Sequence, residues 1–559
     1  MGATKTFERL AVSLGRLDAP APAFETSVDV TYAGVLFALP ALLVCGLLHQ
    51  TEKHFQLPRG YYRLDSIFLL LAFMALSRIK AVEDLRYAAP GEWGKSLGLD
   101  RIPEAKTLRE KIKSLANEDR PSQWAAVLAV EWMRQEPEAA SVFYVDGHVR
   151  VYNGSQTPLP RHYVSRQRLC LRATVDYWVN AMGGRPFFFV NKDVDPGLIA
   201  VLEKEIIPRL LSDAPNQPTE DTLKENPQLH RLTVIFDREG YSPALFARLR
   251  KQRVACITYR KNPGEAWPET EFFSRRVVLS SGNTIEMRLA ERGVLMGELW
   301  LREVRKLAES GHQTSILSTD YLSDMTVVAV AMFARWSQEN FFKYMRNHFN
   351  LDRLIEYSTE DIPDTTKVVN PEYRRIAAEL RKQQGVHTRL CAQFGAITFT
   401  DELEPRKVEA YQHKKAALQE EIGNIQEGLE ELKQRRKKMK RHMLLSDLPE
   451  NERFQRLSVQ SKYLIDTIKM VAYRAETVMV SLVQEKMSHP DEARSLLRAL
   501  YTAEADILPD PALGTLTVRL HHLANRGSDE VIRHLCSELN STETVFPGTN
   551  LRLTFELVS

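Results

Sequence analysis

The sequence contains little cysteine. Only five cysteines occur in 559 residues, far apart and with no Cys-x-x-Cys pair among them: Cys45, Cys170, Cys256, Cys391 and Cys536. This spacing argues against a disulfide framework and against a cysteine-rich zinc site. A chain of this length can bury a sizeable core without such links, so we expect an ordinary globular protein in a reducing compartment.

Long hydrophobic runs and a secretion signal are also lacking. The N-terminus has no apolar core of the kind that a signal peptide needs. The one transmembrane candidate, residues 33–48, falls short of the roughly 20 residues that span a bilayer, and Pro40 interrupts it. We therefore predict no membrane partner and a cytoplasmic location.

Neither sign of charge dominates the composition. The 75 lysines and arginines nearly balance the 72 aspartates and glutamates, which leaves a formal net charge of +3. No overall attraction to nucleic acid follows from such a balance. Any surface that binds an anionic partner must be local.

Changes in composition along the chain predict five segments. A helical N-terminal region that could bind DNA comes first, and a strand-rich domain with a β-rich insertion follows it. A linker with helices leads to a helical hairpin or short coiled coil, and a small α/β tail ends the chain. The expected bounds are 1–138, 139–350 with the insertion at about 260–325, 351–400, 401–505 and 506–559.

The second segment has the alternation of an α/β fold. Strand patterns, rich in β-branched and aromatic residues, alternate with helical spacings, and a long helical run follows the insertion. The order strand, strand, strand, helix, strand, helix, strand predicts a mixed sheet with helices packed on it. Residues 141–154 are expected to form a strand, a turn at Gly147 and a second extended piece. The other expected strands are 169–181, 186–190, 231–237 and 254–259, and the expected helices are 198–211, 242–252 and 321–349.

Two acids directly follow apolar strand patterns. Asp146 comes after Val-Phe-Tyr-Val, and Asp237 after Leu-Thr-Val-Ile-Phe. An unpaired carboxylate is costly inside a core, but it is well placed at the open end of a sheet, where ligands of α/β proteins bind. Taken alone, each would more often be a turn or capping residue.

A third acid lies in the long helical run. Arg335, Glu339, Lys343 and Arg346 recur at spacings of three and four, which brings them near one face of a helix. One acid among three bases suits a surface that meets phosphate. The simpler alternative is an exposed helix on which Glu339 pairs with Lys343.

Together these motifs resemble those of the DDE transposases of bacterial insertion sequences. The resemblance rests on Asp146-Gly, on the run Asp-Arg-Glu-Gly from Asp237, and on Arg335-xxx-Glu339-xxxxxx-Arg346. It is closest to the group with a Tyr-xx-Arg-xxx-Glu-xxxxxx-Lys signature, although Met332 replaces the tyrosine and Arg346 the lysine. The β-rich insertion before the glutamate helix is also similar. The resemblance covers approximately residues 140 to 350.

The resemblance implies a ribonuclease-H-like mixed sheet and metal-dependent cleavage and strand transfer of double-stranded DNA. Asp146, Asp237 and Glu339 would be the catalytic carboxylates and the metal ligands. Two Mg²⁺ ions, for which Mn²⁺ could substitute, activate the attacking oxygen and stabilise the leaving oxygen. Arg335, Lys343, Arg346 and Arg238 would contact DNA. A homodimer around two transposon ends, in a bacterial cytoplasm and associated with the nucleoid, is the expected setting.

The C-terminal region combines an apolar seam with a basic run. Its seam has alternating spacings of four and three, which predicts about two heptads of coiled coil: Leu418, Ile422, Ile425, Leu429 and Leu432. Residues 433–441, seven of them basic, follow directly. They form either a solvated helix face or a contact to the DNA backbone, through Arg435, Arg436, Lys437 and Lys438.

Two other functions compete with a transposase. The first is a metal-dependent nuclease of similar fold that does not transfer strands, and the second is a domesticated DNA-binding protein without chemistry. A zinc site is disfavoured, because His521, His522 and His534 near Cys536 do not have the spacing of a usual ligand set.

Overall fold

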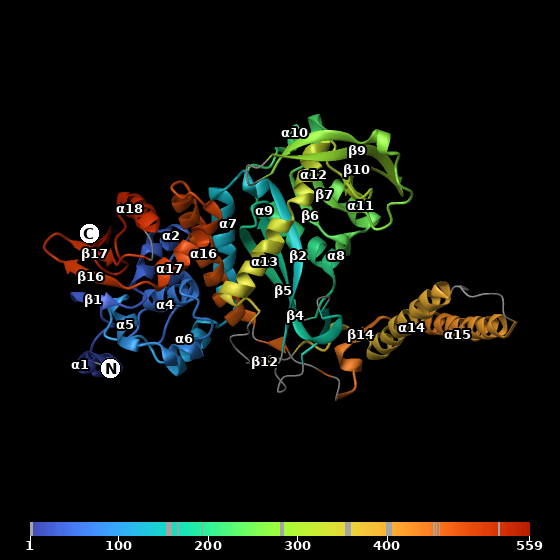
Figure 1. Cartoon of the computed structure of the whole chain (residues 1–559). Helices are drawn as coiled ribbons and strands as arrows, with labels where there is room; N and C mark the ends of the chain where they lie inside the picture. Colours follow the sequence, from blue (N-terminus) through green and yellow to red (C-terminus); the bar gives the residue numbers. More distant parts are fainter. Residues whose placement is uncertain are drawn as a thin grey trace. The chain divides into compact units, whose positions relative to one another are not determined.

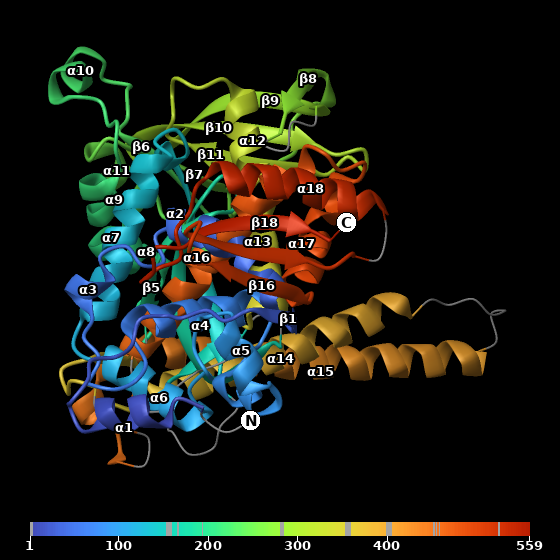
Figure 2. The same ribbon diagram turned by 90° about the vertical axis from the view of Figure 1, so that its left-hand side faces the viewer.

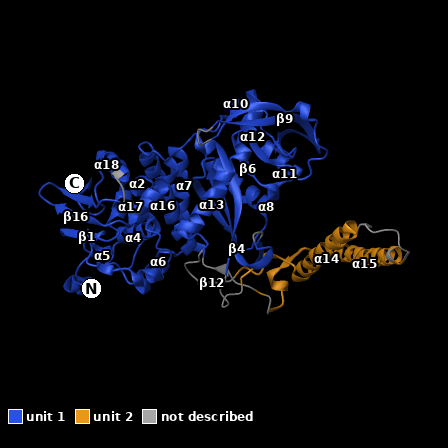
Figure 3. Cartoon of the chain, in the orientation of Figure 1, with its two compact units in different colours: residues 1–154, 161–358, 457–559 blue, residues 155–160, 359–456 orange. Residues whose placement is uncertain are grey.

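The computed structural model describes most of the chain. The described residues are 4–152, 159–164, 167–192, 194–279, 284–352, 359–360, 362–397, 405–450, 453, 456–457, 459–523 and 526–558. They form two compact units (Figure 3). The first comprises residues 1–154, 161–358 and 457–559, and the second comprises residues 155–160 and 359–456.

A ten-stranded mixed sheet forms one side of the first unit (Figure 1). Its strands follow the order β3-β4-β2-β6-β7-β11-β10-β9-β8, and β5 pairs with β4 beside that path. The bounds are β2 Val142–Val151, β3 Arg161–Val164, β4 Leu169–Ala181, β5 Pro186–Lys192, β6 Leu232–Phe236, β7 Val254–Tyr259, β8 Phe273–Val278, β9 Thr284–Met296, β10 Leu299–Leu307 and β11 Gln313–Ser318.

The middle of this sheet is parallel. Strand β2 pairs with β6, and β6 with β7, both in parallel, whereas β4 and β5 run antiparallel on the other side of β2. The mixed α/β class that the sequence predicts is therefore confirmed. The predicted strands at 169–181 and 254–259 have the observed bounds of β4 and β7.

The strands of the insertion continue the same sheet. Strand β11, which the alternation pattern did not reveal, pairs antiparallel with β7 and connects the β8–β10 hairpins to the central strands. One residue from each of β2, β6, β7 and β11 packs with helix α12 (Met325–Phe333) in a single apolar cluster: Tyr144, Ile235, Ile257 and Ile316. This face of the sheet carries the candidate site.

The helix predicted at 321–349 is in fact two helices. Helix α12 ends at Phe333, and α13 runs from Trp336 to Phe349. The apolar spacing continues across the junction, so periodicity alone could not detect the break. Arg335 occupies the break as the residue before α13.

The rest of the first unit is mostly helical and joins both ends of the chain. Helix α16 (Val459–Gln484) is buried along most of its length. It packs against α2 (Leu39–Val44), α4 (Leu64–Leu76), α7 (Arg120–Gln135), α17 (Ala493–Thr502) and α18 (Arg526–Ser541). The predicted segment 401–505 differs here, because α16 and α17 belong to the first unit and not to a hairpin with residues 401–440.

A small second sheet also combines the two ends. Its order is β1-β16-β17-β18, with bounds Ser27–Val30, Ala505–Asp510, Thr515–Leu520 and Arg552–Leu557. Figure 2 shows this sheet beside α17 and α18. The N-terminal residues thus do not fold apart from the tail, although the sequence suggested separate segments at 1–138 and 506–559.

The second unit is built on a helical hairpin. Helices α14 (Pro371–Ala396) and α15 (Pro405–Lys438) pack together, and β13 (Lys367–Val369) pairs with β14 (His442–Leu444) at their base. Leu429 of the predicted seam is buried, and the other four seam residues are half-buried. No helix within the described residues is both long and apolar enough to cross a membrane.

Candidate active site

Asp146 and Asp237 lie next to each other on neighbouring strands. Strands β2 and β6 pair in parallel up to Val145 and Phe236. Asp146 is the next residue of β2, and Asp237 directly follows the end of β6. Neighbouring strands are about 4.8 Å apart, so the register brings the two backbones to that separation. The sequence predicted both acids at strand ends. Asp237 does follow the end of β6, but the prediction was wrong for Asp146, because β2 continues to Val151 without the expected turn at Gly147.

Both acids share a face of the sheet with the apolar cluster under α12. Side chains alternate along a strand, so Asp146 points to the same side as Tyr144, and Asp237 to the same side as Ile235. Tyr144 is fully buried there and donates a hydrogen bond of 2.6 Å to the carbonyl of Ala331 at the end of α12. Asp146 and Asp237 therefore lie at the border of this apolar cluster, near the junction between α12 and α13.

Arg335 connects Asp146 with Glu339. One guanidinium nitrogen lies 3.4 Å from Asp146 Oδ2, and another lies 3.4 Å from Glu339 Oε1. The arginine side chain is only 13% exposed, whereas that of Glu339 is 63% exposed. A cationic group thus lies between two of the three predicted carboxylates.

Gln338 fixes the helix that carries Glu339. Its amide is fully buried, and Nε2 donates to Asn180 Oδ1 at 2.9 Å and to the carbonyl oxygens of Trp178 and Tyr144 at 3.3 and 3.4 Å. The adjacent Ser337 donates to the carbonyl of Met182 at 2.6 Å. These contacts tie the first turn of α13 to β2 and to the β4 end. The sequence motif gave no indication of this role.

The electrostatics of the edge are unfavourable for two free carboxylates. Burial raises the pKa of Asp146 to about 7, the Arg335 guanidinium opposes this rise, and the nearby Asp237 and Glu239 carboxylates add to it. Part of the Asp146 charge is held by the Gly147 amide, which donates to Oδ1 at 3.0 Å. A cation at this edge would relieve the repulsion.

Glu239 is an acid of the site that sequence reasoning did not select. Asp237 caps the turn Arg238–Gly240, and its side chain accepts a hydrogen bond of 2.8 Å from the amide of Glu239. A Cβ on Gly240 would come within 2.3 Å of the Phe236 ring, so this turn requires glycine. The run Asp-Arg-Glu-Gly was the available signal, and it indicated the turn but not the second carboxylate.

The predicted DNA contacts are divided between the two units. Arg238 is exposed and lies 5.8 Å from the Tyr259 ring centroid. On α13, Lys343 is exposed, and Arg346 is half-buried with Nε donating to the carbonyl of Phe342. The four residues of the basic run are at the end of α15 in the second unit, all exposed except the half-buried Arg436: Arg435, Arg436, Lys437 and Lys438.

The three predicted metal ligands do not yet converge. In the described part of the chain, the set whose ligand atoms all lie within 4.8 Å of one another is Asp29, Asp506 and His521. Asp146, Asp237 and Glu339 are not such a set, with Arg335 between the first and the last. Asp146 and Asp237 nevertheless provide adjacent hard oxygen donors of the kind that Mg²⁺ prefers.

Two of the histidines near the C-terminus contact different aspartates. His521 contacts Asp506 at 3.1 Å, and His522 contacts Asp529 at 2.9 Å. Cys536 is buried.

Comparison with known proteins adds two similarities. The family model described as "Transposase protein" matches residues 1–559. The chain is also similar to a solved piggyBac transposase synaptic complex with hairpin DNA, at 10% identity and a TM-score of 0.29, over 86% of this chain and 84% of that chain. No curated protein sequence matches the chain.

Proposed function

Because the chain belongs to the transposase family whose model matches its whole length, we propose that it is a DDE-type DNA transposase. Asp146, Asp237 and Glu339 would be its catalytic carboxylates and metal ligands. The observation that carries the proposal is the parallel register of β2 and β6, which brings Asp146 and Asp237 side by side. The family membership alone says nothing about which residues act.

The fold we propose is ribonuclease-H-like, of the bacterial insertion-sequence group. The mixed sheet supports it, with two acids next to each other on the paired strands β2 and β6 and the third acid on a helix that follows a β-rich insertion. The signature residues Arg335 and Glu339 also contact each other. The departures at Met332 and Arg346 affect possible phosphate contacts and leave the acid set complete.

The chemistry of the acid edge fits divalent metal. Carboxylate oxygens are the preferred ligands of Mg²⁺, and a cation would offset the repulsion that raises the pKa of Asp146. Two Mg²⁺ ions, or Mn²⁺ in their place, would supply activation of the attacking oxygen and stabilisation of the leaving oxygen. Asp146 and Asp237 would hold the ions from the sheet, and Glu339 from the helix.

The residues around the acids would prepare the site for DNA. Gln338 would keep the start of α13 fixed on the sheet while Glu339 turns towards the two aspartates. Arg335 would leave its carboxylate partners and bind a DNA phosphate, because two oxygens of a phosphate can each accept a hydrogen bond from one guanidinium. Lys343, Arg346 and Arg238 would contact flanking phosphates, which position the duplex without reading its sequence.

Double-stranded DNA is the proposed partner, both as transposon ends and as target. The basic residues 435–438 of the second unit would add backbone contacts. A homodimer would hold two ends at once, in the bacterial cytoplasm and on the nucleoid. Each of these expectations rests on the proposed activity.

Incubating the purified full chain with labelled transposon ends and a supercoiled target plasmid in Mg²⁺ tests the function. Joined products are the expected result. Cut ends without joining would identify a nuclease that lacks strand transfer. Binding without cutting, in Mg²⁺ and in Mn²⁺, would indicate a DNA-binding protein without chemistry, and both outcomes would refute the transposase.

A further inference from the structure

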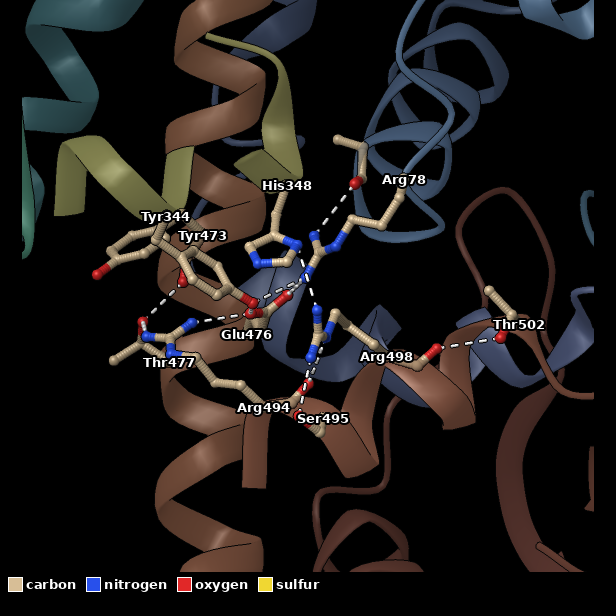
Figure 4. A network of polar contacts seen from close by, with 11 residues as sticks. Arg78, Tyr344, His348, Tyr473, Glu476, Thr477, Arg494, Ser495, Arg498 and Thr502 are labelled. Carbon is tan, nitrogen blue, oxygen red and sulfur yellow. Dashed lines mark hydrogen bonds and ion pairs between the residues drawn. The ribbon is translucent and has the colours of Figure 1, made fainter. Parts of the chain in front are cut away.

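A group of three arginines surrounds one buried glutamate, on the opposite side of α13 from the acids. Glu476 of α16 is fully buried. Around it lie Arg78, after the end of α4, and Arg494 and Arg498 of α17 (Figure 4). We call Arg78, Arg494 and Arg498 the Glu476 arginine cluster. All these elements belong to the first unit.

Two of the arginines neutralise Glu476. Arg78 forms an ion pair with its Oε2, and Arg494 donates to its Oε1 at 2.8 Å. The Tyr344 hydroxyl also donates to Oε1, so the carboxylate is fully occupied. The single negative charge of Glu476 is therefore shared by two guanidinium groups.

Arg498 has only neutral partners in the described part of the chain. Its guanidinium contacts His348 Nδ1 at 3.3 Å, Ser495 Oγ at 2.8 Å and the carbonyl of Arg494 at 3.3 Å. Burial lowers the pKa of His348, as do the nearby Arg498 and Arg78, so this histidine is neutral and accepts the hydrogen bond. Arg498 thus keeps its full positive charge.

The cluster therefore has two excess positive charges, with three guanidiniums against one carboxylate. Gathering like charges away from bulk water is costly unless an anion reaches them. Solvent does reach them, since the side chains of Arg78 and Arg494 are 15% and 26% exposed and Arg498 is half-buried. Arg78 Nε has no hydrogen-bond partner within the described residues. Guanidinium forks suit the paired oxygens of phosphate.

From this charge and geometry we infer that the Glu476 arginine cluster binds backbone phosphates of double-stranded DNA, as a second contact surface apart from the acids. The inference rests on the proposed function. His348 follows Glu339 by nine residues, about two and a half helical turns, so the two lie on opposite flanks of α13. The cluster would thus hold a DNA segment other than the one being cut.

The salt dependence of DNA binding tests this surface directly. The variant Arg498→Gln removes one of the two excess charges without removing a partner of Glu476. Arg498→Lys keeps the charge, and Arg552→Gln is the matched control, because it removes an exposed arginine that pairs with Glu543. The full chain is titrated with a transposon-end duplex at several salt concentrations, and thermal unfolding is measured for each variant.

The slope of log affinity against log salt is negative, and loss of one phosphate contact reduces its magnitude by about 0.9. We expect this decrease for Arg498→Gln alone, with its unfolding temperature unchanged. Equal slopes for wild type and Arg498→Gln would overturn the inference, as would an equal decrease for Arg552→Gln. A stabilising shift with inorganic pyrophosphate that Arg498→Gln abolishes, beside equal DNA slopes, would assign a small phosphorylated ligand instead. If the wild type binds no DNA, the proposed function itself fails.

Discussion

The Arg335 guanidinium lies 3.4 Å from the Asp146 carboxylate, at the position where a cation would be expected between Asp146 and Glu339. Removing this charge should favour a metal ion that competes for the same oxygens. We predict that Arg335→Gln binds Mn²⁺ about tenfold more tightly than wild type in the absence of DNA, which corresponds to about 1.4 kcal/mol. Titration calorimetry measures this change.

The control for Arg335→Gln is Arg346→Gln, which removes a charge from the same helix. Arg346 donates to a backbone carbonyl and contacts none of the three acids. Its Mn²⁺ affinity should stay within about twofold of the wild type. Equal affinities for Arg335→Gln and wild type would show that the arginine does not compete with metal.

The pKa of Asp146 predicts a pH dependence of metal binding. Burial raises this pKa from 3.8 to about 7, so the carboxyl is largely protonated below neutral pH and a metal ion must displace that proton. Mn²⁺ affinity should therefore rise from about pH 6 to about pH 8 and then level off. Asp146→Asn should abolish the rise, and an affinity of the wild type that is flat over this range would contradict the assignment.

The same group has the opposite effect on folding. The folded state binds this proton more tightly than the unfolded chain does, so the stabilisation is complete below pH 3.8 and is lost as the pH rises through about 7. Without metal, the free energy of unfolding of the wild type should therefore fall relative to that of Asp146→Asn between acidic pH and pH 8. Urea unfolding of both proteins at the two pH values measures this difference. A difference in unfolding free energy between the two proteins that does not change with pH would count against the raised pKa of Asp146.

Gln338 should matter for both stability and activity. Gln338→Met keeps the volume but leaves Asn180 Oδ1 and two carbonyls without their donor, which should cost about 1–3 kcal/mol of unfolding free energy. Cleavage should fall as well, because the start of α13 positions Glu339. The exposed Gln135→Met is the control and should change stability by less than about 0.5 kcal/mol. Unchanged cleavage in a destabilised Gln338→Met would exclude the positioning role.

The basic run of α15 should account for a large share of the salt dependence of DNA binding. Replacing Arg435, Arg436, Lys437 and Lys438 by glutamine should reduce the magnitude of the negative slope of log DNA affinity against log salt by up to about 3.6, if each contacts one phosphate. Changing both arginines to lysine keeps the charge and should leave the slope as it is. A slope that survives neutralisation would leave these residues as a solvated helix face.

The sequence was sufficient for the elements whose own pattern decides them. Strands β4 and β7 contain β-branched and aromatic residues, and both were predicted to the residue. The position of Asp237 at a strand end also followed from the sequence, because it directly follows the apolar strand β6, whereas Asp146 lies within β2 and not at its end. The residue pattern of a segment predicts its structure well where the burial of that segment's own side chains determines it.

Features that depend on distant contacts were not predictable. The break between α12 and α13 puts Arg335 between two acids, but its spacing is that of one continuous helix. The pairing of β1 with β16 joins residues almost 500 positions apart, and no periodicity encodes it. Arg498 lacked any motif, since its significance comes from Glu476 and His348 on other helices.

Mn²⁺ binding and DNA cleavage by conservative acid variants, measured side by side, test the central claim most directly. Asp146→Asn, Asp237→Asn and Glu339→Gln each remove one ligand charge and almost no volume, while Glu286→Gln removes an exposed acid from β9 as the control. We predict that each of the three loses cleavage and weakens Mn²⁺ binding while DNA affinity remains, and that the control behaves as wild type. Normal metal binding and cleavage in any one of the three would contradict the account.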